Sequence, residues 1–228
     1  MICTESLEAR MAQHLQEVIA RIEKARIAYS RHQIIKLVAI SKYWQEEQIL
    51  ELYKSGQRAF GENKVQDLKH KSEALGDYPL EWHFVGSIQE NKINTLLALQ
   101  PTLIHSIDSL KTAQAFQKRL EREGKTQRAL LQINASKEES KSGVSPEEAE
   151  EVYLEILESC PALLLEGVMS IGANTQDQQE IKRGFELTQR TYDALPGAKI
   201  LSMGMSGDFE LAISCGANLV RIGSALVG

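Results

Sequence analysis

The sequence has few of the features that mark secreted, membrane or metal-binding proteins. Its 228 residues contain three cysteines, an odd number without a C-x-x-C pair, so neither a disulfide framework nor a zinc site is predicted. No apolar run approaches the ~20 residues of a membrane-spanning helix. Residues 1–18 lack the continuous apolar core of a secretory signal. We therefore expect a soluble cytoplasmic protein that holds no metal.

An excess of basic residues is also missing. Lysine and arginine number 26 against 31 aspartates and glutamates, which gives a net charge of −5. Proteins that bind nucleic acid usually carry a basic patch, and the densest basic stretch here, K-H-K at 69–71, is interpreted as a solvated helix face. We expect neither nucleic acid nor a membrane among the partners.

Eight short β-like runs alternate with helical segments along the chain. The runs cover 35–40, 58–61, 81–86, 103–108, 129–134, 165–171, 199–205 and 219–223. Strands that alternate with helices predict β/α units and a parallel sheet. Eight such units favour a closed α/β barrel of the (β/α)8 TIM type over an open doubly wound sheet, and no G-x-G-x-x-G motif follows the first run. We expect residues 1–228 to form this single domain.

An extra helix is predicted ahead of the first strand. Apolar side chains recur at helical spacing through 7–29. Because little sequence follows the eighth run, this helix is expected to cover the place of a missing eighth helix. Ser145 before Pro146 predicts the start of a helix. Another helix is predicted to start at Asp108 or Ser109 and to end at Gly124.

Polar residues gather where the predicted strands end, which is the face on which such barrels bind ligands. His83, inside the third run, could point into the barrel. The residues that follow the strands are Lys42, Glu62, Asn63, Ser87, Gln89, Asn91, Ser206, Asp208, Gly223 and Ser224.

The last two of these loops contain small residues suited to an anion. M-S-G-D at 205–208 follows the seventh run, and R-I-G-S-A at 221–225 follows the eighth. Barrels frequently bind phosphate between these loops, where backbone N–H groups approach the anion and the hydroxyls of Ser206 and Ser224 could add donors. The alternative is that both are ordinary turns with a serine at the start of a helix.

Lys42 ends the apolar stretch L-V-A-I-S-K at 37–42. Its amine either reaches back to water, as strand-end lysines commonly do, or occupies a pocket that needs an amine. An amine opposite a phosphate site suits a ligand with both a carbonyl group and a phosphate, since lysine forms Schiff bases with carbonyls. A sugar phosphate in a Schiff-base aldolase and pyridoxal 5′-phosphate (PLP) both fit.

Four further residues have two interpretations each. Arg221 could face the ligand or pair with an acid inside the barrel, and His83 is more often a core histidine than a general base. Lys137 and Lys141 are rival amines, but their surroundings, S-K-E-E-S-K-S-G, are typical of a flexible charged loop.

Several motifs in order along the chain are more specific. They are V-A-I-S-K, F-G-E-N-K-V-Q-D, W-H-F-V-G-S-I-Q-E-N-K, H-S-I-D-S, L-L-Q-I-N-A-S-K-E-E-S-K-S-G, E-G-V-M-S-I, L-S-M-G-M-S-G-D-F-E-L-A-I and V-R-I-G-S-A-L-V-G. From about residue 35 onward the sequence resembles the pyridoxal-phosphate homeostasis protein (YggS/PROSC) family. The resemblance implies a barrel similar to the N-terminal domain of alanine racemase, with PLP as the cofactor.

The resemblance also implies roles for particular residues. Lys42 would hold PLP as an internal aldimine, Asn63 would lie near its ring, and Arg221 would meet either the ring nitrogen or the phosphate. The full set of expected cofactor residues is Lys42, Asn63, His83, Met205, Ser206, Arg221, Ile222, Gly223 and Ser224. Ser224 replaces the threonine that is commoner in the family, and it keeps the hydroxyl.

Catalysis is not expected. Two-base racemisation needs a second acid/base opposite the lysine, and in related racemases a second all-β domain of the partner subunit supplies it. The barrel uses up the 228 residues, and Tyr43, next to Lys42, is expected to point to the opposite face. We expect a monomeric PLP carrier or buffer that meets PLP-dependent apo-enzymes transiently. A residual PLP-dependent racemase or lyase activity, or a Schiff-base aldolase, remains the alternative.

Overall fold

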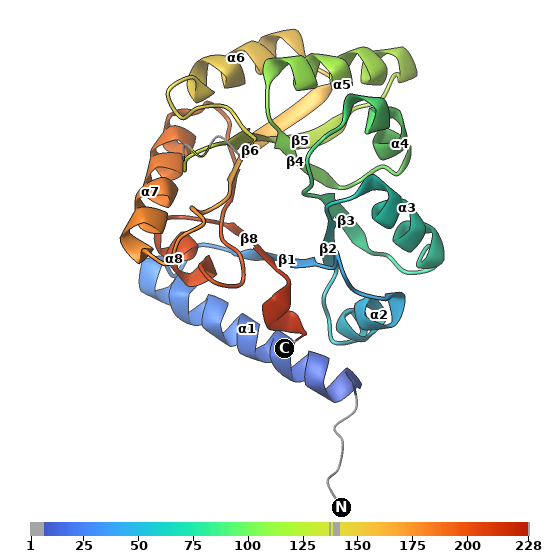
Figure 1. Cartoon of the computed structure of the whole chain (residues 1–228), viewed down its shortest axis with the longest axis vertical. Helices are drawn as coiled ribbons and strands as arrows, with labels where there is room; N and C mark the ends of the chain where they lie inside the picture. Colours follow the sequence, from blue (N-terminus) through green and yellow to red (C-terminus); the bar gives the residue numbers. More distant parts are fainter. Residues whose placement is uncertain (1–6, 137, 139–141, 228) are drawn as a thin grey trace, which may run out of the picture.

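The barrel is closed. The computed structural model describes residues 7–136, 138 and 142–227, and in these residues eight parallel strands pair in chain order, with β8 next to β1 (Figure 1). The strands are β1 Lys36–Ile40, β2 Ala59–Glu62, β3 Glu81–Phe84, β4 Leu103–Ile107, β5 Gln127–Ile133, β6 Leu163–Ser170, β7 Ile200–Ser202 and β8 Leu219–Ile222. Each overlaps one of the eight predicted runs, so the predicted (β/α)8 barrel is confirmed.

Helices surround the barrel and connect successive strands (Figure 1). The helices are α1 Leu7–Tyr29, α2 Glu46–Lys54, α3 Val65–Ala74, α4 Ile93–Ala98, α5 Leu110–Glu123, α6 Ala149–Ser159, α7 Gln178–Ala194 and α8 Phe209–Ser214, with short 3-10 helices η1 Glu90–Lys92 and η2 Ser224–Leu226. The caps of α5 are confirmed, since Ser109 accepts a bond from the Thr112 amide and Gly124 is left-handed at φ 61°.

The predicted start of α6 is wrong by three residues. Ser145 accepts from the backbone N–H of Glu148 at 3.3 Å and donates to its carboxylate at 2.6 Å. This exchange closes a separate turn over 145–148, and the helix begins only at Ala149. Pro146 therefore lies in the turn, not in the first turn of the helix.

Alternation along each strand divides the core in two. Outward-facing residues such as Ala39 and Phe60 pack under the helices, while Val38, Ala59 and Leu103 belong to a smaller cluster inside the barrel. The interior also holds buried polar residues, which are His83, His105, Ser202 and Arg221. The interior is thus packed, and a ligand is expected beyond the carboxyl ends of the strands.

Helix α1 covers the place where an eighth barrel helix would lie. It buries one stripe, Met11, Leu15, Val18 and Ile22, each at most 4% exposed. It contacts α8, α2 and η2, and Figure 1 shows it running beside η2 from α8 towards α2. The prediction for this helix is therefore confirmed. Among the described residues, no helix is long and apolar enough to cross a membrane.

Candidate functional site

Two adjoining cavities open at the carboxyl ends of the strands. The β1/β8 cavity, of about 580 Å³, is lined among others by Lys42, Ser206 and Ser224. The β2/β3 cavity, of about 470 Å³, is lined among others by Lys42 and Asn63. Both have Ile40, Lys42, Met205 and Arg221 in their walls. Each volume falls within the ~300–1,000 Å³ of small-molecule sites.

Lys42 lies in the turn that follows β1 and is exposed. Its ammonium lies over the ring of Tyr43, with Nζ 5.1 Å from the ring centroid. The expectation that Tyr43 points to the opposite face is wrong, because β1 ends at Ile40 and strand alternation does not continue into the turn. Tyr43 therefore shares the β1/β8 cavity with the lysine.

Arg221 brings a buried positive charge to the floor of both cavities. Its Nη1 donates to the carbonyl and the hydroxyl of Ser202 at 2.9 and 2.6 Å, and its Nη2 donates to the Ser170 carbonyl at 2.8 Å. Burial lowers the pKa of Arg221 to about 10, while the carboxylate of Asp208 opposes this shift. The guanidinium stays charged at neutral pH and is held by oxygen acceptors in the barrel wall.

The loops after β7 and β8 are tied together by one serine. The Oγ of Ser206 accepts from the backbone N–H groups of Gly223 and Ala225 at 3.2 and 3.3 Å. Because the oxygen accepts both bonds, its own hydrogen is free to donate into the β1/β8 cavity. Ser224 is exposed at the same rim. This arrangement offers hydroxyl donors to an anion.

Asn63 lines a cavity, whereas the side chain of Ile222 does not. Asn63 is half-buried in the β2/β3 cavity, and its backbone approaches β3 so closely that a Cβ on Gly86 would lie 1.9 Å from its carbonyl oxygen. Ile222 points away from the cavities and is fully buried under the helices. The strand alternation that turns Arg221 inward turns the side chain of Ile222 outward, so only its backbone remains for the predicted contact with the cofactor.

His83 points into the barrel but does not reach either cavity. Its Nδ1 meets His105 Nε2 at 2.9 Å, and His105 Nδ1 meets the Ser202 hydroxyl at 3.1 Å. Since Ser202 accepts from Arg221, its hydrogen goes to His105, which then donates to His83. Burial lowers the pKa of both imidazoles, well below the ordinary value for His105. His83 thus lies outside the lining of both cavities and is linked to Arg221 through His105 and Ser202, so its predicted contact with the cofactor stays a prediction.

Comparison with known proteins supports one family. A family profile described as the alanine racemase N-terminal domain matches residues 14–228. The pyridoxal phosphate homeostasis protein of Helicobacter pylori (strain ATCC 700392 / 26695) is 58% identical over 214 residues, covering 94% of this chain and 96% of the relative. That of Aquifex aeolicus (strain VF5) is 39% identical over 225 residues, covering 95% and 96%. The chain belongs to the pyridoxal phosphate homeostasis protein family.

Solved structures agree with the family's fold. PipY of Synechococcus elongatus PCC7942, whose structure is described as having PLP bound, matches with a TM-score of 0.82 at 28% identity, covering 96% of this chain and 100% of PipY. The alanine racemase of Corynebacterium glutamicum matches with a TM-score of 0.71 at 18% identity, covering 96% of this chain and 60% of that one. At that identity, the racemase supports the shared barrel only.

Most residues that the family resemblance assigns to the cofactor lie together. Lys42, Asn63, Met205, Ser206, Arg221, Gly223 and Ser224 line the two cavities. Lys137 and Lys141, the rival amines, lie outside the described residues. Among the described residues, no group of three His, Cys, Asp or Glu could hold a metal ion.

Three residues beside the site were misplaced or missed from sequence. Glu62, expected at the mouth, is the last residue of β2 and turns its buried carboxylate outward to Lys71 of α3. Lys71, taken as part of a solvated face, is 6% exposed. Ser41 bonds to both. A signal for Lys71 was available, because it follows Leu68 by three residues on the apolar stripe of α3.

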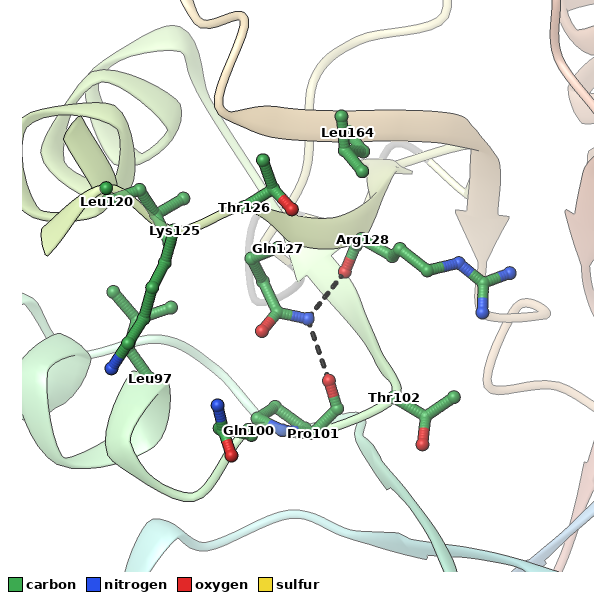
Figure 2. Close-up of a pocket in the computed structure, with 11 residues that line it drawn as sticks. Leu97, Gln100, Pro101, Thr102, Leu120, Lys125, Thr126, Gln127, Arg128 and Leu164 are labelled. Atoms are coloured by element: carbon green, nitrogen blue, oxygen red, sulfur yellow. Dashed lines mark hydrogen bonds between the residues drawn. The ribbon is translucent and has the colours of Figure 1, made fainter.

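A separate cavity of about 500 Å³ lies at the opposite end of the barrel, where β4 and β5 begin. Figure 2 shows its lining, with the side-chain amide of Gln127 donating to the carbonyls of Pro101 and Arg128. Arg128 itself pairs with Glu166. The Gln127 amide and the Arg128 guanidinium are therefore both engaged with other protein groups.

Proposed function

We propose that this protein binds PLP at Lys42 and acts in PLP homeostasis as a reversible carrier. The observation that carries the proposal is the joint placement of an exposed lysine amine, a charged arginine and two serine hydroxyls around one pair of cavities. The names of the relatives and the PLP-bound PipY structure support the same ligand. They favour PLP over a sugar phosphate, and hence over an aldolase.

The residues fit the chemical groups of PLP. PLP supplies an aldehyde that condenses reversibly with amines, together with a dianionic phosphate. Lys42 offers the amine, and its exposure leaves it open to solvent and to competing amines. The hydroxyls of Ser206 and Ser224 offer donors to the phosphate, while Asn63 lines one cavity from the loop after β2 and Arg221 lines both from β8. The guanidinium of Arg221 can donate either to the phosphate or to the lone pair of the ring nitrogen.

A carrier role is also supported by what lines the cavities. Among the described residues, their walls contain one phenol, Tyr43, and no histidine, aspartate or glutamate. Proton exchange at a substrate carbon needs a placed acid/base, which is worth about 10²–10⁴-fold in rate. Tyr43 presents its ring face to the lysine ammonium. A weak racemase or lyase activity is therefore the second candidate, and it would depend on the Tyr43 hydroxyl.

Replacement of Lys42 tests the ligand and the attachment site together. Wild-type protein is incubated with PLP, reduced with borohydride and digested, and the modified peptide is identified by mass spectrometry. We expect the PLP mass on Lys42, and Lys42→Ala should lose the bound cofactor together with its absorbance. Lys141→Ala is the matched control and should keep both. Retention of the cofactor by Lys42→Ala with its loss in Lys141→Ala would refute the site.

A further inference from the structure

Behind the turn that carries Lys42 lies a buried ion pair. Glu62 is fully buried and Lys71 is 6% exposed, and the Lys71 Nζ donates to Glu62 Oε1 at 2.7 Å. The pair lies outside the barrel wall, since Glu62 ends β2 and Lys71 belongs to α3. It does not line either cavity at the mouth.

Both members of the pair are bonded to Ser41. The Lys71 ammonium donates to the Ser41 carbonyl at 2.7 Å, and the Ser41 hydroxyl donates to Glu62 Oε1 at 2.6 Å. The backbone N–H of Ser41 donates to the Gly61 carbonyl at 3.0 Å, and the Trp44 N–H closes the turn onto the Ser41 carbonyl at 2.8 Å. The hydroxyl, the carbonyl and the N–H of Ser41, the residue before Lys42, are therefore all hydrogen-bonded.

A contribution to the stability of the fold does not by itself explain why this ion pair is present. Removing two charges from water is unfavourable, and apolar replacements of a buried ion pair are often neutral or stabilising. The carboxylate is moreover incompletely satisfied, because Glu62 Oε1 accepts two bonds while Oε2 has no hydrogen-bond partner in the described part of the chain. What the pair does specify is geometry, since both charged groups meet at one residue of the Lys42 turn.

We propose that Glu62 and Lys71 are positioning residues, which fix the Ser41 turn so that the Lys42 amine faces the aldehyde of a ligand anchored by its phosphate. This inference rests on the proposed function of Lys42. The amine and the aldehyde condense with loss of one water molecule, and their rate depends on how well the anchored ligand meets the amine. A displacement of about 1 Å in such a geometry costs roughly 10²-fold in rate.

The pair predicts a specific kinetic signature. Pyridoxal carries the same aldehyde as PLP but no phosphate, so its reaction with Lys42 gains little from alignment with the anion site. The ratio of the two capture rates measures that alignment. A purely structural role for Glu62 and Lys71 would change both rates, or neither, by the same factor.

The test compares two double variants that each remove one ion pair. Glu62→Gln with Lys71→Met removes the pair behind Lys42 without leaving a lone buried charge. Arg128→Met with Glu166→Gln removes the bidentate pair at the opposite end of the barrel, where Nε and Nη2 lie 2.9 and 2.7 Å from the carboxylate. Circular dichroism and urea unfolding establish that each is folded. Stopped-flow absorbance gives the capture rates of PLP and pyridoxal, and peptide mass spectrometry after reduction locates the product.

We expect the PLP-to-pyridoxal ratio to fall about 10- to 100-fold in the Glu62/Lys71 variant and to stay at the wild-type value in the Arg128/Glu166 variant. Reductive methylation of Lys42 by formaldehyde with cyanoborohydride as the hydride donor should proceed at the wild-type rate in both, since the amine remains exposed. Ser41→Ala, which removes one bond and leaves the pair matched, should lower the ratio by a smaller factor. It serves as the test if the double variant does not fold.

An unchanged ratio in every folded variant would overturn the positioning role while leaving PLP binding intact. Absence of PLP on Lys42 in the wild type would instead refute the proposed function itself. The two failures are therefore distinguishable in one set of measurements.

Discussion

Two serine hydroxyls lie at the mouth of the barrel. Ser206 joins the β7 and β8 loops through two accepted bonds and keeps its hydrogen for a ligand. Ser224 lies at the rim of the same cavity, and among the described residues its hydroxyl makes no corresponding bond to a backbone amide. Their contribution to binding should be specific to the phosphate.

Removing both hydroxyls should weaken the binding of PLP and leave the binding of pyridoxal unchanged. Hydrogen bonds to a charged group are worth about 1.5–3 kcal/mol, so Ser206→Ala with Ser224→Ala should raise the Kd for PLP by ~10-fold or more. Equilibrium titration with PLP and with pyridoxal measures this, and urea unfolding checks the fold. Equal weakening for both ligands would indicate general damage to the site, and an unchanged PLP affinity would exclude the phosphate contact.

The buried histidines make a pH-dependent contribution to stability. His83 and His105 have pKa values lowered by burial, so the unfolded chain takes up protons on them before the folded chain does. Stability is therefore complete above the unfolded pKa of about 6.5 and is lost as the pH falls below it. For each histidine that stays neutral in the folded state, the free energy of unfolding falls by about 1.4 kcal/mol between pH 7.5 and pH 5.5.

His105→Gln should flatten this dependence. Glutamine keeps a donor for His83 but does not titrate, so the fall in the free energy of unfolding between pH 7.5 and pH 5.5 should shrink by about 1.4 kcal/mol. Urea unfolding at the two pH values measures the change. The exposed His32 provides the control variant, His32→Gln, which should behave as wild type. If the two variants show the same pH dependence, the neutral buried state of His105 is wrong.

Residue positions were predictable where chain order alone decided them. Lys42, Asn63, Ser206 and Gly223 follow strands, and a parallel barrel brings all strand ends to one face. Lys71 lies on the apolar stripe of α3, but its ion pair was not predictable, because its partner Glu62 belongs to another element and a charged residue ordinarily faces water.

At the scale of elements, α1 supports the site from behind. Its buried stripe packs on α8 and α2, and it also contacts η2, which carries Ser224. Loss of packing at α1 should therefore affect both the stability of the barrel and the rim of the β1/β8 cavity.

Leu15→Ala should destabilise the protein, whereas Ile19→Ala should not. Leu15 is 2% exposed and Ile19 is 46% exposed on the same helix. Truncation of a buried leucine costs about 2–5 kcal/mol, while an exposed substitution stays within about 0.5 kcal/mol. Urea unfolding of the two variants gives the comparison, and PLP titration below the transition reports on η2. Similar stabilities for the two variants would mean that α1 is not docked as described.

Periodicity explains which elements were predictable. The eight strands are short apolar runs between turns, and α1 has a clear stripe, so all nine were located from sequence. The start of α6 was misjudged because Ser145 has a typical capping sequence but bonds to Glu148 within its own turn. Competition between a turn and a helix start is decided by geometry that the residue types do not specify.

At the scale of the whole molecule, barrel closure brings the first and last strands together. β1 pairs with β8, so Lys42 and the R-I-G-S-A motif, about 180 residues apart in the chain, share one cavity. The predicted barrel was sufficient to infer this proximity. It was not sufficient to infer how far each side chain lies from the cavities. His83 points into the barrel but is buried among interior side chains and does not line either cavity.

An open cavity lined by one amine and no carboxylate should hold PLP without turning over amino acids. We expect the protein to sediment as a monomer and, when loaded, to pass PLP to an apo-enzyme such as an aminotransferase. Incubation of the loaded protein with L-alanine in deuterated water tests catalysis directly, with mass spectrometry and chiral chromatography as readouts. No catalytic incorporation of deuterium and no D-alanine are expected, with alanine racemase as the positive control.

Tyr43 decides how the opposite result would be understood. If deuterium enters with loss of handedness, and Tyr43→Phe abolishes the exchange while PLP remains on Lys42, the phenol beside the lysine is the missing acid/base and the protein is a racemase. If Tyr43→Phe leaves transfer to the apo-enzyme at the wild-type rate and neither form exchanges deuterium, the ring serves only to cover the Lys42 ammonium. The carrier role then follows from the same geometry, because an exposed amine accepts the cofactor and gives it up to another amine without a second group to divert the reaction.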